Sequence, residues 1–223
     1  MDRLLFFFLL ASTASFAQTR LQFSPQLHGE ILTIAEEEMG AAAGAKQVET
    51  LRFYLSNIRL LRGGAEVYTP TKKHHLLDVE IPASLTIPLD LPESLRYDEL
   101  VFTIGVDSLT SAAGVFGGDL DPTLGMYWTW RSGYIHFKLE GSAPECPGRN
   151  HRFQFHVGGY QAPFNAIREV RLAVDSKEPI SVRVDLDRFF QATDLREKYQ
   201  VMSPNEEAMT LADLLTHLFY LKD

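Results

Sequence analysis

Apolar and polar residues alternate along most of the chain with a period of two, the pattern of strands that bury one face. In the clearest example, residues 51–60 are followed by a Gly63-Gly64 turn and by residues 65–69, and this pair is predicted to form a β-hairpin. Further short strands are predicted at 76–81, 84–89, 99–106, 127–140, 152–157, 166–175 and 180–187. No convincing helical pattern separates them, so the chain is predicted to be all-β, an antiparallel sandwich or barrel-like domain.

Three segments depart from this alternation. Residues 35–45 are rich in Ala and Glu and are compatible with one or more helical turns, whereas the glycine-rich residues 111–125 are predicted to be a long loop. Near the C-terminus, an acidic start with Pro204 in the first turn precedes apolar residues at helical spacing. These apolar residues are Met209, Leu211, Leu214, Leu215, Leu218 and Phe219. The chain is therefore predicted to end in an amphipathic helix packed on the sheet.

The N-terminus has the features of a secretory signal peptide. Met1-Asp2-Arg3 precedes an unbroken apolar run at 4–10, and the small residues Ser15 and Ala17 occupy the −3 and −1 positions of a cleavage site. The run is too short for a membrane-spanning helix, which needs about 20 residues, and the alternative is a buried first strand. Cleavage after Ala17 would leave 206 residues (223 − 17), a single domain over 18–223 in the periplasm or outside the cell, with no transmembrane segment.

Composition and charge exclude several classes of protein. The chain is 45% hydrophobic and 22% charged, which is ordinary for a globular domain, and its net charge of −8 argues against binding to nucleic acid. The single cysteine, Cys146, rules out an intrachain disulfide and is predicted to lie in an exposed loop. The sequence contains no hydrolase elbow, phosphate-binding loop, dinucleotide fingerprint or zinc-protease motif, so no enzyme activity is predicted.

Both tryptophans lie in one predicted strand. As neighbours two residues apart, Trp128 and Trp130 would share one face, while the apolar residues at the odd positions 135–139 would occupy the other. A bulge at residues 132–133 would reconcile the two patterns and would turn His136 away from the tryptophans. Without a bulge, His136 would line up with them, and the sequence leaves both arrangements open.

His156 is the most promising histidine for a ligand. It shares a predicted strand face with Arg152 and Gln154 and is followed directly by Val157 and two glycines. Imidazole suits copper well, although a hydrogen-bonded surface histidine is the alternative interpretation. The acidic residues Asp107, Asp119 and Asp121 around the glycine-rich loop are candidates for calcium, and turn formation is the alternative for them.

Several segments together resemble the MbnP-like family over nearly the whole mature chain. They are residues 55–60, 121–130, 132–134, 138–141, 156–159 and 166–170, and the most specific run is Met126 to Tyr134. The family is exported and β-rich, and it is related to copper-binding proteins of methane-oxidising bacteria. In its characterised members, histidines and a kynurenine made from tryptophan hold the copper. A di-haem cytochrome c peroxidase of the MauG-like type carries out that oxidation.

The resemblance implies a role for five residues. Trp128 or Trp130 is the candidate for oxidation to kynurenine, His156 matches the His-x-Gly position as a copper ligand, and His136 and His28 are candidates for a second ligand. It also implies a MauG-like di-haem partner and a periplasmic metal-binding function. The alternative function is an exported β-sandwich module that binds a glycan or a protein through exposed aromatic residues and holds no metal.

Overall fold

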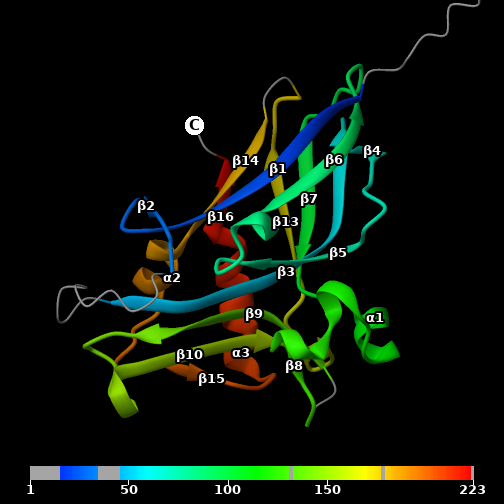
Figure 1. The fold of residues 1–223 in the computed structure, drawn as a ribbon. Helices are drawn as coiled ribbons and strands as arrows, with labels where there is room; N and C mark the ends of the chain where they lie inside the picture. Colours follow the sequence, from blue (N-terminus) through cyan, green and yellow to red (C-terminus); the bar gives the residue numbers. More distant parts are fainter. Residues whose placement is uncertain (1–15, 35–45, 131–132, 177–178, 222–223) are drawn as a thin grey trace, which may run out of the picture.

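The computed structural model describes residues 16–34, 46–130, 133–176 and 179–221, and most of its strands form two sheets (Figure 1). The first sheet has the order β16-β14-β1-β2, with β6 also paired to β1. Its strands are β1 (Phe16–Leu27), β2 (Glu30–Ile31), β6 (Thr86–Pro92), β14 (Ile180–Asp185) and β16 (Phe219–Leu221). β1 runs parallel to β14 and antiparallel to β6. Most of the predicted signal peptide lies outside the described residues, and cleavage after Ala17 would leave β1 from Gln18 onward.

The second sheet is larger and has the order β13-β7-β3-β9-β10-β15, with β4, β5 and β8 attached at its side. Its strands are β3 (Gln47–Arg62), β4 (Ala65–Tyr68), β5 (His74–Asp78), β7 (Glu99–Ile104), β8 (Tyr127–Trp128), β9 (Gly133–Ser142), β10 (Arg152–Gly158), β13 (Arg168–Ala173) and β15 (Gln200–Val201). A separate small hairpin consists of β11 (Tyr160–Gln161) and β12 (Phe164–Asn165). The predicted hairpin between residues 51–60 and 65–69 is confirmed as β3 and β4.

The alternating pattern buries one face of each sheet against the other. In β3, Leu51, Phe53 and Leu55 are fully buried in the main core, whereas the residues between them face the opposite side. Phe53 meets Phe23 of the first sheet edge to face, with ring centroids 6.4 Å apart. Phe53 also stacks on Phe137 of β9 at 5.8 Å. The core therefore lies between the two sheets, and the predicted all-β fold is confirmed.

Within the described residues, three short α-helices and five 3-10 turns connect the strands. They are α1 (Ser108–Ala113), α2 (Leu186–Ala192), α3 (Glu206–Leu215), η1 (Pro82–Leu85), η2 (Gly118–Leu120), η3 (Pro122–Leu124), η4 (Arg149–His151) and η5 (Thr216–Leu218). The predicted C-terminal helix is confirmed as α3, which packs against β10, but it ends at Leu215, so Leu218 and Phe219 lie in η5 and β16 instead. Its N-cap is Asn205, whose side chain accepts a hydrogen bond from the Ala208 amide, and Pro204 precedes the cap. The chain then returns to the first sheet as β16.

Three sequence predictions about individual segments are wrong. Residues 186–187 do not continue a strand, because the Asp185 side chain accepts a hydrogen bond from the Arg188 amide and caps α2. Residues 127–140 are not one strand but the hairpin β8–β9. Cys146 is not in an exposed loop, because only 1% of it is exposed and it belongs to the main core as a free thiol.

The possible helical segment at 35–45 lies outside the described residues. No helix within the described part of the chain is long and apolar enough to cross a membrane.

Candidate functional site

The two tryptophans lie at the tip of the β8–β9 hairpin rather than along one straight strand. Tyr127 pairs with Tyr134, and Trp128 pairs with Gly133, so the chain reverses direction directly after Trp128. Trp128 is 6% exposed and Trp130 is 64% exposed, yet their ring centroids are only 6.1 Å apart. The hairpin thus places one buried and one exposed indole in contact.

Trp128 lies close against strand β10 because residue 158 has no side chain. A Cβ atom on Gly158 would lie 2.8 Å from Cζ3 of Trp128 and 2.7 Å from the carbonyl oxygen of Tyr134, which real side chains do not tolerate. Gly158 follows His156 by two residues on the same strand, so both face the same side of the sheet, about 7 Å apart. The structure therefore brings Trp128 to the strand face that carries His156.

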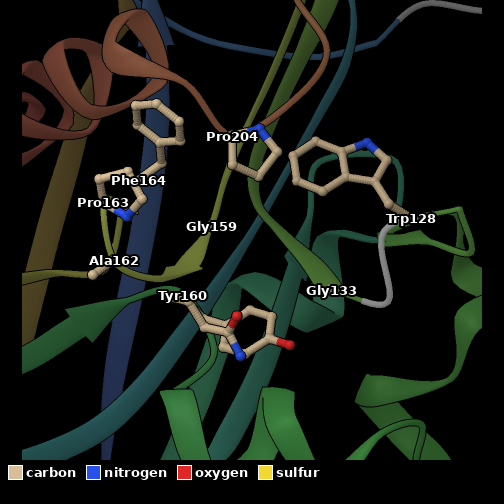
Figure 2. Close-up of a pocket in the computed structure, with 9 residues that line it drawn as sticks. Trp128, Gly133, Gly159, Tyr160, Ala162, Pro163, Phe164 and Pro204 are labelled. Atoms are coloured by element: carbon tan, nitrogen blue, oxygen red, sulfur yellow. The ribbon is translucent and has the colours of Figure 1, made fainter.

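A small pocket opens beside Trp128, and mostly aromatic and proline rings form its walls (Figure 2). Its volume is about 100 Å³. Trp128 and Pro204 face each other at one side of the pocket, Tyr160 lies across from them, and Phe164 with Pro163 closes the other side. Ser108 of α1 donates a hydrogen bond of 2.8 Å to the backbone oxygen of Tyr160 and so ties α1 to this region. Such a lining suits a flat or apolar group of a few atoms.

His156 is held by a carboxylate on the neighbouring strand. It is buried, and its Nε2 lies 2.7 Å from Oε1 of Glu140. The hydrogen bond from His156 lowers the pKa of Glu140, and the ammonium group of Lys138, 3.8 Å from the other carboxylate oxygen, acts in the same direction. Glu140 is therefore ionised and accepts a hydrogen bond from the Nε2–H group of His156. In the tautomer that donates from Nε2, the lone pair of the ring lies on the other nitrogen, Nδ1.

The polar face of the second sheet continues from this pair as a row of charges. Lys138 lies opposite His156 in β10 and opposite Arg52 in β3. Arg52 forms ion pairs with Asp78 at 2.8 Å and with Glu80 at 2.6 Å, and its guanidinium donates to the backbone oxygen of Leu124. The 3-10 turn η3 is thereby attached to this face, and the charges partly screen each other in a half-buried layer.

His136 occupies a different environment from His156. Val157 pairs with Phe137 but the next residue, Gly158, pairs with Ile135, so His136 is the extra residue of a β-bulge in β9. This bulge lies at residue 136 rather than at the predicted residues 132–133, of which residue 132 lies outside the described part of the chain. His136 is fully buried, and neither ring nitrogen has a hydrogen bond of good geometry. Burial lowers its pKa to about 4; the backbone of Ala166 acts against this shift and the charge of Arg168 acts with it.

The remaining candidates are separated from His156. His28 lies in the turn between β1 and β2 of the first sheet, where its Nδ1 is 3.4 Å from a carboxylate oxygen of Asp187 in α2. Asp107 caps α1, Asp121 caps η3, and Asp119 accepts hydrogen bonds from the Leu76 amide and Lys72. Asp107 and Asp121 thus stabilise their own turns, in line with the turn-forming interpretation, whereas Asp119 links η2 to β5 and to Lys72. Within the described residues, no three His, Cys, Asp or Glu side chains are grouped to hold a metal.

Sequence reasoning missed two residues of this site, Glu140 and Gly158. Glu140 faces His156 because residues 142 and 152 pair across the β9–β10 connection, which fixes the register of the two strands. A hairpin assignment for these strands, with Lys138, Glu140, Gln154 and His156 on one face, would have revealed the contact. The role of Gly158 has no sequence signal of its own, because it depends on the position of Trp128 in space.

Comparison with known proteins is consistent with this architecture. A family model described as MbnP matches residues 16–204. Among solved structures, MbnP from Methylosinus trichosporium is similar with a TM-score of 0.53 and 15% sequence identity, and the match covers 82% of this chain and 80% of that chain. At this identity the structural likeness shows a shared fold. Among the curated proteins, none matches.

Proposed function

Because the chain belongs to the MbnP family, we propose that it is an exported copper-binding protein that uses His156 as a ligand. The observation that carries the proposal is the hydrogen bond between Nε2 of His156 and Glu140, 2.7 Å long. Histidines that bind metals almost always donate their other ring N–H to a carboxylate, a carbonyl or water, which fixes the tautomer and orients the ring. Glu140 supplies this arrangement and leaves Nδ1 as the donor atom.

The donor chemistry at His156 fits copper in part. A neutral imidazole is a preferred copper ligand, and copper has the highest affinity of the divalent first-row metals for nitrogen donors. His136 is fully buried within a bulge, and His28 lies in the other sheet, so neither is grouped with His156. The adjacent aromatic residue is Trp128, which packs against Gly158 on the same strand face. We propose that Trp128, once oxidised to kynurenine, supplies the second donor through its aryl amine.

The oxidation balances with hydrogen peroxide as the oxidant. The indole C2–C3 bond is cleaved and two oxygen atoms are added, while two peroxide molecules are reduced to water. Hydrolysis then releases formate and leaves the aryl amine of kynurenine. The proposed catalyst is a di-haem peroxidase partner of the MauG-like type, and this chain is its substrate rather than an enzyme. Trp130, exposed and in ring contact with Trp128, is the residue through which electrons leave the buried indole for the partner.

Copper titration of the mature protein from its native host, together with intact-mass and peptide-mass analysis, tests the proposal. His156→Ala is expected to weaken copper binding by more than about tenfold, and Glu140→Gln by about 10- to 100-fold. His217→Ala is the matched control, because His217 is an exposed histidine in η5. Copper affinity that is unchanged in His156→Ala would remove the assignment. An unmodified Trp128 in a copper-loaded protein would remove kynurenine from the site.

The pocket beside Trp128 favours a second candidate function. Its rings and its small volume suit a flat group of a glycan or of a protein partner, as expected for an exported binding module without a metal. Unmodified tryptophans and no copper uptake in the native protein would favour this function. Binding that is lost in Tyr160→Ala would place the ligand in the pocket.

A further inference from the structure

A second cavity is larger than the pocket beside Trp128. It lies between the β4–β5 connection, the turn η1 and strand β6, and its volume is about 590 Å³. We name it the β4–β6 cleft. Figure 1 shows β4, β5 and β6 on one side of the molecule. The volume lies within the range of roughly 300–1,000 Å³ that is typical of small-molecule sites. Its main polar lining residues are Tyr68, Lys72, His75, Thr86, Asp90 and Asp119.

The charges that face the cleft disfavour an anionic ligand. Lys72 is paired with Asp119, with 2.7 Å between Nζ and a carboxylate oxygen, and the two charges offset each other. Asp90 forms no ion pair with any described residue. His75 adds no positive charge at neutral pH, because burial, with the charge of Lys72, lowers its pKa to about 4. A single net negative charge therefore remains, so phosphates and carboxylates are repelled.

The polar groups of the cleft include both hydrogen-bond donors and hydrogen-bond acceptors. The Tyr68 hydroxyl accepts a hydrogen bond of 3.2 Å from the Asp90 amide, so its own proton is directed elsewhere and is available to a ligand. The Asp90 carboxylate accepts, and the Thr86 hydroxyl does both. Ala83 and Pro88, both exposed, add apolar wall beside these groups. A ligand that matches this surface has many hydroxyl groups on an apolar carbon frame.

We propose that the β4–β6 cleft binds a small neutral saccharide. The hydroxyl groups of a saccharide both donate and accept, and its C–H faces suit Ala83 and Pro88. A simple cation would satisfy Asp90 but would leave the hydroxyl groups and the apolar wall unused. The cleft shares no lining residue with the pocket beside Trp128, so this proposal is independent of copper binding.

Titrations with cellobiose, maltose and N,N′-diacetylchitobiose, followed by two-dimensional ¹H–¹⁵N NMR of the mature protein, test this proposal. At least one sugar is expected to shift the resonances of residues that line the cleft. Tyr68→Phe is expected to weaken that binding about fivefold, because it removes one hydrogen bond. Asp90→Asn is expected to weaken it by about tenfold or more, because an uncharged amide oxygen is a weaker acceptor than a carboxylate. Tyr220→Phe, in a half-buried tyrosine of β16, is the matched control and is expected to bind as the unchanged protein does.

Four results would overturn the proposal. The first is the absence of shifts with all three sugars. The second is a set of shifts confined to the surroundings of Trp130. The third is equal affinity of Tyr68→Phe and Tyr220→Phe when both variants keep the dispersed spectrum of a folded protein. The fourth is a cleft that responds to spermidine, the cationic probe, and to none of the sugars.

Discussion

Protonation of the buried His136 is predicted to destabilise the protein in acid. Its folded-state pKa is about 4, compared with 6.5 for a free histidine, because burial removes water from the ring. Between these two values the unfolded chain binds a proton that the folded chain does not. Stability is therefore fully present above about pH 6.5 and is lost as the pH falls towards 4. The difference between the two pKa values corresponds to roughly 3 kcal/mol of unfolding free energy, at 1.36 kcal/mol for each pH unit.

Urea denaturation at pH 7, 6, 5 and 4 measures this loss when His136→Gln is compared with the unchanged protein. The buried His75, also with a lowered pKa, and all carboxylates titrate in both proteins, so the difference between the two curves isolates His136. This difference is expected to change by about 3 kcal/mol from pH 7 to pH 4, with the His136→Gln variant less sensitive to acid. His217→Gln, in an exposed histidine, is expected to leave the profile unchanged.

Parallel profiles for the unchanged protein and His136→Gln would refute the reasoning. They would show that the imidazole has water or a partner that solvates its charged form. The pKa of His136 measured directly by NMR separates these explanations from a failure of the stability assay. A value near 6.5 would contradict the buried environment, whereas a value near 4 would confirm it.

Three further predictions concern packing. Gly105→Ala is expected to cost about 1–3 kcal/mol more unfolding free energy than Gly114→Ala. Both glycines have similar positive φ values (114° and 106°), but only a Cβ on residue 105 would lie 2.7 Å from the His136 ring. Equal losses in urea denaturation would contradict this contact. Gly158→Ala is expected to displace Trp128 and change its fluorescence and near-ultraviolet circular dichroism, whereas Gly117→Ala, with open space around it, changes neither; an unaltered spectrum in Gly158→Ala would place the indole elsewhere. Cys146 is expected to react with a thiol reagent only after unfolding, because it is buried and burial raises the pKa of its thiol; rapid labelling of the folded protein would argue for an exposed loop.

The alternating sequence predicts the strands that bury one face but not the points where the chain reverses. Leu51, Phe53 and Leu55 follow the period of two, which is enough to place them on the buried face of one strand. Around the tryptophans the apolar parity changes, and such a change is compatible with a bulge or with a hairpin. The structure contains both, because the chain turns after Trp128 and bulges at His136. Local periodicity carries no information on which of the two occurs.

The candidate site is predictable as far as single residues allow. His156 stands out because a histidine precedes flexible backbone at a strand end, and the family resemblance supports it. Glu140 escapes such reasoning, because its contact with His156 depends on the register between two strands. The isolation of His28 is also not predictable, because it depends on the sheet to which this residue belongs. The burial of His136 depends in the same way on the side chains that the fold packs around it.

The parallel pairing of β1 with β14 governs when this fold can be completed. Leu21 lies opposite Ile180, and β14 is in turn bordered by β16, so the first sheet joins the two ends of the described chain. A nascent chain in which Ile180 has not yet been synthesised has only β2 and β6 to pair with β1. Contacts of such long sequence separation form slowly, because the entropy of closing the intervening loop is lost first. The topology therefore delays completion of the first sheet until the segment that carries β14 has been synthesised.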